Sequence, residues 1–201
     1  MTKVAILGFG TVGSGVAEVL SKNSQGIARR SSGEIQVKYI LDVRDFPDSP
    51  FKDCFVKDFS IIENDPAVDV VVETIGGAKV ALEFTTRALK AGKSVVSSNK
   101  ELVATHGYEL LQLAKANGVS YLFEASVGGG IPILRPLTNC LAANEVEQIT
   151  GILNGTTNYI LTRMIKAGLT FEQALKEAQD NGYAEKDPTA DVDGHDACRK
   201  I

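Results

Sequence analysis

The sequence predicts an α/β fold built on a parallel sheet. Between residues 3 and 123, short apolar runs of strand length alternate with stretches of helical periodicity. Several runs are continuously apolar, as in strands covered on both faces. Strands that alternate with helices in this way form parallel sheets with right-handed crossovers. The glycine triplet at residues 128–130 then interrupts the rhythm, and we expect a domain boundary there, with domains at 1–132 and 133–201.

Composition agrees with a globular protein and narrows its class. The 201 residues are 44% hydrophobic and 23% charged, a balance that argues against disorder. The formal charge of −4, without a long run of either sign, disfavours nucleic acid as a partner. The longest apolar runs are too short for a membrane span, and the three cysteines form no CxxC pair. We therefore expect a cytoplasmic protein that does not associate with membranes.

The first domain reads as strand, glycine turn and helix, followed by further strands and helices in alternation. Apolar residues at helical spacing follow the first glycine turn. A later helix is expected to end at Gly118, because glycine readily adopts the left-handed conformation that terminates many helices. The predicted strands are residues 3–7, 35–41, 68–75, 94–97 and 119–123, and the predicted helices lie around 12–20, 82–89 and 101–117.

The second domain has a different character. We expect a helix at 133–141, a strand at 146–153 and a helix from 156 to 166 that ends at Gly168. Thr170 and Gln173 have the spacing of a capping box and begin a helix that runs to Gly182. A polar loop at 182–194 leads to a six-residue helical pattern that is too short to be stable alone. The second domain is therefore predicted to be a partial α+β domain, cut short.

A GxGxxG motif occupies residues 8–13, directly after the first strand and at the start of a helix. In that context Gly8 permits the tight turn, Gly10 lets the backbone approach a pyrophosphate, and Gly13 allows close packing of helix and strand. The helix N-terminus then faces the phosphates. The motif predicts a Rossmann-type, parallel-sheet nucleotide-binding domain. A glycine-rich turn without a ligand is the alternative.

Asp42 and Arg44 follow the second strand, where the adenosine ribose is recognised in such folds. A carboxylate accepts hydrogen bonds from the ribose hydroxyls of NAD, whereas a guanidinium can hold the additional phosphate of NADP. The two residues point to different cofactors, and both could instead face solvent. The sequence leaves NAD and NADP open.

Three further groups are candidates for chemistry. Lys100 follows the strand at 94–97, at the sheet edge where open α/β folds bind ligands, although a solvated lysine is the alternative. Glu124 and the following glycines suit a hard monovalent cation or a simple hinge. Asp196 and Lys200 are four residues apart and share a helical face, either as a surface salt bridge or as part of a pocket.

Five segments together resemble homoserine dehydrogenase. The first motif is common to many dehydrogenases, but the last two, in this order and spacing, are specific to that family. The resemblance covers nearly the whole chain and rests on residues 8–13, 99–101, 124–132, 151–160 and 182–200. It implies reversible reduction of L-aspartate 4-semialdehyde to L-homoserine with NAD(P)H, in threonine, methionine and isoleucine biosynthesis, by a protein that is a homodimer when complete.

The resemblance also assigns site residues. Lys200 is implied to be the proton donor, and Lys100 to lie between the nicotinamide and the substrate. The implied substrate residues are Glu185, Asp196, Gly155 and Thr156. The cofactor is implied to contact Gly8, Phe9, Gly10, Thr11, Val12, Gly13, Arg44 and Lys100, and a structural sodium ion to be held by Glu124, Val127, Gly129 and Ile131.

The chain departs from the family in one respect, and two other functions are alternatives. Members of the family continue past the position of Lys200, so we expect this 201-residue piece to bind a dinucleotide weakly and to reduce little or nothing. A thiol-dependent semialdehyde dehydrogenase of the GxGxxG class is one rival, although Cys54, Cys140 and Cys198 are poorly placed for it. A non-catalytic dinucleotide-binding fragment is the other.

Overall fold

The chain forms two compact units in the computed structural model, which describes residues 1–31 and 33–201. The first unit is Met1–Ile133 and the second is Leu134–Ile201. The division lies one residue after the boundary that we placed from the glycine triplet. The described residues contain no helix that is both long and apolar enough to cross a membrane.

The first unit is built on a six-stranded parallel sheet with the strand order β3-β2-β1-β4-β5-β6. This is the order of a Rossmann fold, in which the chain reverses direction across the sheet between β1 and β4. The predicted fold class is thus confirmed. The strands are β1 Thr2–Leu7, β2 Ile35–Leu41, β3 Phe55–Val56, β4 Val70–Glu73, β5 Ser94–Ser97 and β6 Tyr121–Leu122.

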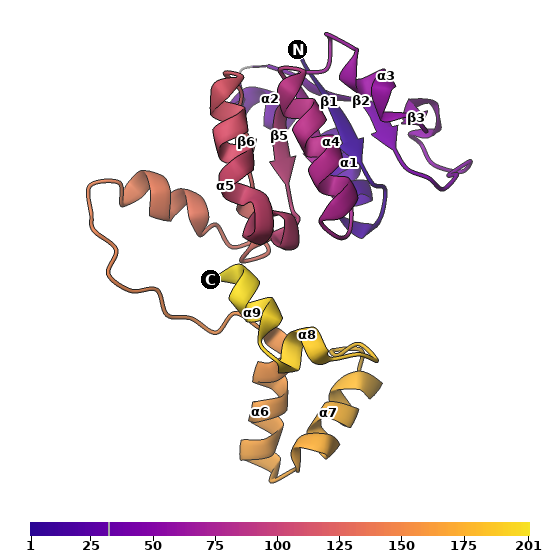
Figure 1. The fold of residues 1–201 in the computed structure, drawn as a ribbon. Helices are drawn as coiled ribbons and strands as arrows, with labels where there is room; N and C mark the ends of the chain where they lie inside the picture. The colour runs from indigo at the N-terminus through magenta and orange to yellow at the C-terminus, as the bar shows by residue number, and fades with distance from the viewer. Residues whose placement is uncertain (32) are drawn as a thin grey trace. The chain divides into compact units, whose positions relative to one another are not determined.

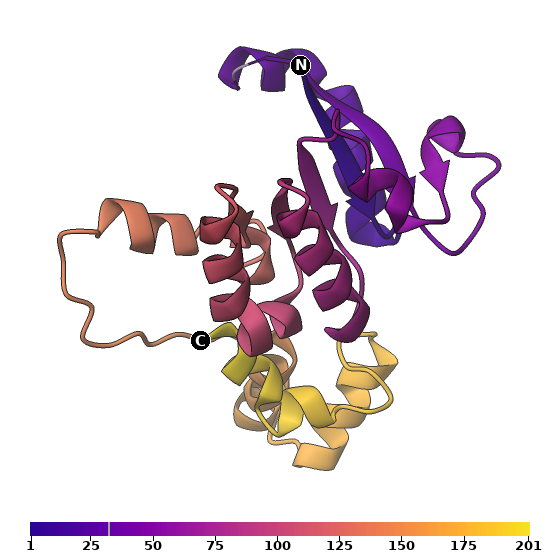
Figure 2. The ribbon, with the colours of Figure 1, turned by 45° about the horizontal axis from the view of Figure 1, so that its top comes forward.

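Apolar side chains cover both faces of this sheet, as the continuous apolar runs predicted. Val4, Ile6 and Ile40 pack with Ala17 of α1 on one face. The other face packs against helices α3, α4 and α5, and α4 and α5 lie next to each other in Figures 1 and 2. The helices of this unit are α1 Thr11–Lys22, α2 Ser24–Arg30, α3 Phe59–Glu63, α4 Lys79–Lys90 and α5 Lys100–Ala116, with short 3-10 turns at Lys52–Cys54 and Glu124–Ser126.

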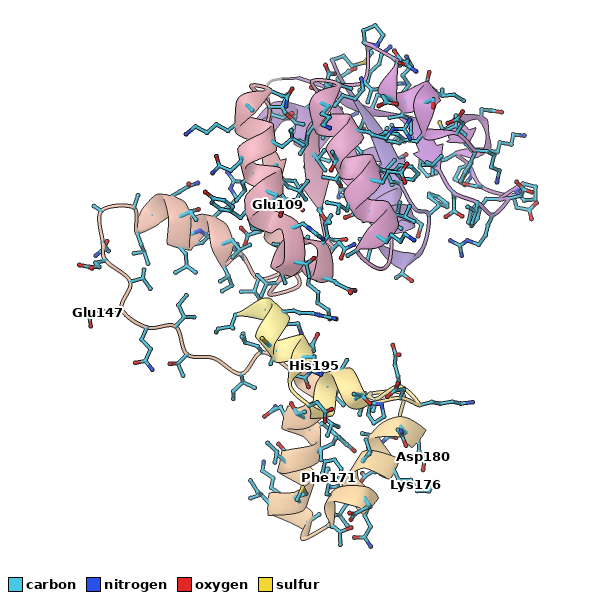
Figure 3. The ribbon with its side chains drawn as sticks, viewed as in Figure 1. Glu109, Glu147, Phe171, Lys176, Asp180 and His195 are labelled. Atoms are coloured by element: carbon cyan, nitrogen blue, oxygen red, sulfur yellow. The ribbon has the colours of Figure 1, made fainter. Side chains whose placement is uncertain are left out.

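The second unit, in its described residues, is helical. Helices α6 (Gly155–Ala167) and α7 (Phe171–Asp180) pack around Ile160, and the short helices α8 (Thr189–Val192) and α9 (His195–Lys200) follow. The predicted signals at two helix ends are confirmed: Gly168 closes α6 in the left-handed conformation, and Thr170 with Gln173 forms a capping box on α7. Figure 3 marks Lys176 and Asp180, whose charged groups lie 3.6 Å apart on α7.

The strand that we predicted at 146–153 is wrong. These residues have no regular secondary structure, and Val146, Ile149 and Ile152 are at least half exposed. Glu147 is marked on this extended segment in Figure 3. A strand needs a neighbour for its backbone hydrogen bonds, and the described residues of the second unit contain no other strand. The predicted helix at 133–141 is a π-helical turn at Pro136–Cys140.

Candidate active site

The glycine motif forms the turn between β1 and α1, and its packing requires glycine. A Cβ atom on Gly13 lies 2.0 Å from the carbonyl oxygen of Gly8 and 2.8 Å from Thr74 Oγ1. Gly8 has φ +89°, in the left-handed region that favours glycine. In contrast, a Cβ on Gly10 meets nothing within 4 Å, so open space lies beside that backbone. Gly8 and Gly13 thus have the structural roles that the sequence indicated, and the space beside Gly10 leaves room for a ligand.

The start of α1 suits an anion. Gly10 caps this 12-residue helix without a side-chain hydrogen bond, and its first turn holds no acidic residue. The N-terminal amide groups and the helix dipole therefore favour a negatively charged group. Thr11 and Val12 are exposed at this position. The Phe9 side chain turns elsewhere, into an aromatic cluster with Phe46 and Phe55 at ring-centroid distances of 5.1 and 5.0 Å.

Asp42 fixes the glycine loop and Arg44 at the end of β2. Its carboxylate accepts from the Phe9 backbone N–H at 2.7 Å and from the Arg44 backbone N–H at 2.9 Å. The Arg44 guanidinium donates to both oxygens of the same carboxylate, at 3.1 and 3.0 Å. These bonds, chiefly those from Arg44, lower the pKa of Asp42 to about 2. Asp42 is therefore ionised and engaged by the protein itself, while the Arg44 side chain is 59% exposed.

A cavity of about 500 Å³ adjoins these groups at the carboxyl edge of the sheet. It lies at the switch point between β1 and β4, where open α/β sheets bind ligands. Its size and partly apolar wall suit an adenosine group. The lining residues are Gly8, Gly10, Leu41, Asp42, Val43, Arg44, Lys57, Thr74, Ile75, Gly76, Val80 and Phe84.

Buried polar side chains join the loops that follow β4 and β5. Glu73 is fully buried, and its carboxyl group accepts from Ser97 Oγ at 2.5 Å and from the Ile75 backbone N–H at 2.7 Å. Burial raises the pKa of Glu73. Asn99 donates to the carbonyl oxygens of Ile75 and Gly77 at 3.0 and 2.7 Å, and its side-chain oxygen caps α5.

Lys100 is held in place by this arrangement. It is the first residue of α5, directly after the capping residue Asn99. Register pairs Leu7 with Glu73 and Glu73 with Ser97, so the ends of β1, β4 and β5 are aligned at one edge. The sequence prediction that Lys100 lies at the carboxyl edge of the sheet is therefore confirmed.

The loop after β6 contains the residues expected to hold sodium. Glu124 begins a 3-10 turn, and its carboxylate accepts a hydrogen bond from the Ile133 backbone N–H. The Ile131 N–H donates to the Gly128 carbonyl at 2.9 Å, which closes a tight turn. Gly129 has φ +58°. No group of three or more metal-binding His, Cys, Asp or Glu side chains occurs in the part of the chain that the structure describes.

In the second unit, Asp196 and Lys200 form an ion pair in which the carboxylate is buried and the lysine is partly buried. Lys200 Nζ lies 2.6 Å from Asp196 Oδ2, and their side chains are 23% and 6% exposed. Lys200 also donates to the carbonyl oxygen of Leu153 at 2.8 Å. Asn154 Nδ2 donates to Asp196 Oδ2 at 2.8 Å and to Asp191 Oδ1 at 2.7 Å. The Lys200 ammonium thus contacts one carboxylate and one backbone carbonyl, and Asn154 joins that carboxylate to Asp191.

The sequence analysis did not select Asn154 or Asp191 as site residues. Asp191 was visible only as one of several acidic residues in the 182–194 loop, which forms the short helix α8 at this point. Asn154 carries a helix-capping signal, since an asparagine precedes α6. The signal in the sequence that could have identified both residues is a capping asparagine followed downstream by an acidic loop.

Of the remaining predicted substrate residues, Gly155 and Thr156 follow Asn154 directly, and Glu185 lies in the loop after α7. Gly155 is the first residue of α6, and a Cβ on it meets nothing within 4 Å. Thr156 Oγ1 donates to the carbonyl oxygen of Tyr183 at 2.8 Å. Glu185 is exposed in the loop after α7, and its backbone carbonyl accepts from Gln179 at 3.0 Å.

The cysteines give no support to a thiol mechanism. Cys54 is partly buried, and burial raises the pKa of its thiol, which lowers the fraction of reactive thiolate. Cys140 and Cys198 are exposed in the second unit. The chemistry that the site offers is instead that of an ammonium group and carboxylates.

The strand order, the glycine turn and the cavity beside it define a dinucleotide-binding protein, and the ammonium–carboxylate cluster is of the kind that oxidoreductases use at a carbonyl or alcohol. Residues 8–124 match the profile of the homoserine dehydrogenase NAD-binding domain, and residues 132–201 match that of homoserine dehydrogenase. The chain belongs to the homoserine dehydrogenase family.

Individual relatives agree with this assignment. The chain is 45% identical to the homoserine dehydrogenase of Bacillus subtilis, over 99% of this chain and 47% of the relative. The crystal structure of a homoserine dehydrogenase from Thiobacillus denitrificans superimposes with a TM-score of 0.90 at 42% identity, covering 99% of this chain and 47% of that one. A hyperthermophilic archaeal homoserine dehydrogenase in complex with NADPH superimposes with a TM-score of 0.85 at 31% identity, covering 99% and 67%. The chain spans about half the length of the curated relatives it matches.

Proposed function

We propose that the protein interconverts L-homoserine and L-aspartate 4-semialdehyde by hydride transfer with NAD(P)(H), in the route to threonine, methionine and isoleucine. The observation that carries the proposal is the Lys200 ammonium, held 2.6 Å from a buried carboxylate in a chain of this family. When bound, the nicotinamide cofactor supplies or accepts the hydride. The residues of the chain bind the cofactor and the substrate and transfer the proton.

Lys200 acts on the substrate oxygen. When a hydride arrives at the aldehyde carbon, negative charge develops on the oxygen, and an ammonium group both stabilises that charge and donates a proton. Asp196 and the Leu153 carbonyl hold Lys200 Nζ at 2.6 and 2.8 Å. The carboxylate and the carbonyl fix the direction of the ammonium group. In the reverse reaction the neutral amine accepts the proton of the homoserine hydroxyl.

The acidic residues around Lys200 suit a substrate that carries an ammonium group. We assign substrate binding to Asp196 and Glu185 through the amino group or an ordered water, and to the first turn of α6 at Gly155 and Thr156. The open space beside Gly155 supports the approach of a small ligand. Lys100, fixed at the start of α5, is assigned to the reactive end of the cofactor.

For the cofactor, the arrangement at β2 favours NADP. Asp42 already accepts hydrogen bonds from Phe9 and Arg44, so it can receive ribose hydroxyls only by releasing them. Arg44 and Lys57 both line the cavity, and a phosphate offers a guanidinium a better partner than a neutral hydroxyl does. NAD binds to the same glycine turn without that charge contact. The cofactor is thus NADP or NAD, with NADP preferred.

The loop of Glu124 is proposed to hold a structural sodium ion. One carboxylate together with the carbonyl oxygens of Val127, Gly129 and Ile131 forms the oxygen-rich donor set that a hard cation prefers. The closed turn at Gly128 supports this assignment, because a Cβ there lies only 2.6 Å from the Ile131 carbonyl oxygen. For the complete protein we propose a homodimer, which sedimentation analysis tests.

The reaction is tested on the product of the complete open reading frame, purified without other dehydrogenases. L-Homoserine is added with NADP or NAD, and reduced nicotinamide is followed by absorbance. We expect turnover with both cofactors and a higher kcat/KM with NADP. Lys200→Ala is expected to abolish turnover and to leave cofactor affinity unchanged. If the purified protein binds the cofactor but does not oxidise homoserine, the result supports the non-catalytic alternative instead.

Cofactor preference has a separate test. Arg44→Ala is expected to weaken NADP binding by at least 10-fold and to change NAD binding far less, because only the phosphate contact is lost. Val43→Ala is the matched control, since Val43 is an exposed neighbour in the same cavity without a charge. Equal losses for both cofactors in Arg44→Ala contradict the phosphate role.

A further inference from the structure

We propose that Asn154 is a positioning residue for the reaction: its carboxamide ties the start of α6 to Asp191 and Asp196 and so fixes the carboxylate that pairs with Lys200. The inference rests on the proposed function and adds to it a residue that acts through its neighbours. It is carried by the hydrogen bonds of one side chain.

The Asn154 carboxamide is engaged on both of its ends. Its oxygen accepts from the Thr157 backbone N–H at 2.7 Å and from Thr157 Oγ1 at 2.8 Å, and thereby caps α6. Its nitrogen donates to Asp191 Oδ1 at 2.7 Å and to Asp196 Oδ2 at 2.8 Å. A primary amide has two N–H donors and two acceptor sites on its oxygen, so these four bonds use its full capacity.

The position of Asn154 makes these bonds effective. The residue is 7% exposed and Asp196 is 4% exposed, so the bonds between them are shielded from water. Two carboxylates that approach each other repel, and a donor between them offsets part of that repulsion. The carbonyl of the preceding residue, Leu153, accepts from Lys200 Nζ at 2.8 Å. The Leu153 carbonyl therefore contacts the ammonium group, and the neighbouring Asn154 side chain contacts both carboxylates.

The capping role and the positioning role can be separated by substitution. Serine is as good a helix cap as asparagine, so Asn154→Ser keeps the acceptor for Thr157 and removes the donor to the two aspartates. Asn154→Asp keeps the shape and the cap but places a third carboxylate in the cluster. Asn154→Ala removes both functions. Thr170→Ala is the control, because the Thr170 side chain caps α7 through Gln173 and its removal costs one helix cap.

The test measures L-homoserine oxidation and urea unfolding on the product of the complete open reading frame. We expect Asn154→Ser to remain folded with a loss of stability comparable to that of Thr170→Ala, and to lose about 100-fold in kcat/KM for homoserine, since misplacement by about 1 Å can cost that much. KM for the cofactor is expected to stay unchanged. Asn154→Asp is expected to lose more, while Thr170→Ala loses stability and keeps kcat/KM.

Each outcome decides between the two claims. An active wild type with an unimpaired Asn154→Ser variant overturns the positioning role and leaves the proposed function intact. The same follows if activity falls only in proportion to lost stability across Asn154→Ser, Asn154→Ala and Thr170→Ala. A wild type that does not oxidise homoserine overturns the proposed function, and the inference with it.

Discussion

Replacing Gly13 by alanine is expected to damage the nucleotide-binding unit because the new methyl group has no room. Its Cβ lies 2.0 Å from the Gly8 carbonyl oxygen and 2.8 Å from Thr74 Oγ1. The first contact is with backbone, which can move away only if the β1–α1 turn opens. Overpacking of this kind costs about 1–3 kcal/mol, and a backbone contact this short puts the expected loss at about 3 kcal/mol.

Gly15 provides a matched control on the same helix. A Cβ on Gly15 meets nothing within 4 Å, and the residue lies inside α1. Alanine is favoured over glycine in a helix by about 0.8–1.0 kcal/mol, so Gly15→Ala is expected to stabilise the protein by up to about 1 kcal/mol. The two substitutions are chemically identical and differ in sign, with an expected separation of about 4 kcal/mol.

Urea unfolding of the two variants, followed by circular dichroism, measures this separation. Cofactor titration by fluorescence gives a second readout, in which Gly13→Ala loses affinity as the turn opens. Gly10→Ala, which has open space, is expected to keep its stability and to lose cofactor affinity. Equal stabilities for Gly13→Ala and Gly15→Ala would refute the packing argument.

Substitutions at three further residues have defined outcomes. The pKa of Asp42 is lowered to about 2 from 3.8, so its bonds stabilise the fold above pH 4 and are lost as the pH falls toward 2. The free energy of unfolding lost over this range is about 2 kcal/mol. Asp42→Asn is expected to flatten that part of the curve of unfolding free energy against pH. Gly168→Ala places a side chain at φ +66° and is expected to lower the free energy of unfolding in urea by about 1–2 kcal/mol. An unchanged unfolding midpoint would contradict this. Glu73→Gln is expected to keep accepting from Ile75 through its oxygen and to donate from its amide nitrogen to Ser97 Oγ. Glu73→Ala leaves both bonds unmade at a cost of about 1–3 kcal/mol, and similar thermal stabilities for the two variants would contradict this.

Local signals predicted the elements whose stability is decided locally or by simple burial. The strand expected at 35–41 is β2, and the strand expected at 94–97 is β5. Leu41 and Val95 pack in the cluster on one face of the sheet, and Ile35, Val37 and Ile40 pack in the cluster on the other. Burial of this kind is what the apolar residues of these short segments indicated. The Thr170 capping box and the Gly168 stop are contacts within one turn of chain, so residue type alone was sufficient.

Features that depend on distant partners were missed or misassigned. The apolar residues at 146–153 have strand character, but a strand forms only with a neighbour, and the described residues of that unit provide none. Asn154 contacts Asp191 and Asp196 across a long separation in sequence, which no local pattern reports. Asp42 was expected to face a ribose or solvent, whereas it is held by Phe9 and Arg44 through contacts that only the folded turn creates.

The most direct test of the account follows one hydrogen atom. NADPH that carries deuterium at the transferable C4 position is incubated with L-aspartate 4-semialdehyde and the product of the complete open reading frame. The account predicts L-homoserine with one deuterium on the carbon that bears its hydroxyl group, detected by mass spectrometry and NMR, and its loss in Lys200→Ala. Unlabelled homoserine, or labelled homoserine formed equally well by Lys200→Ala, would contradict it.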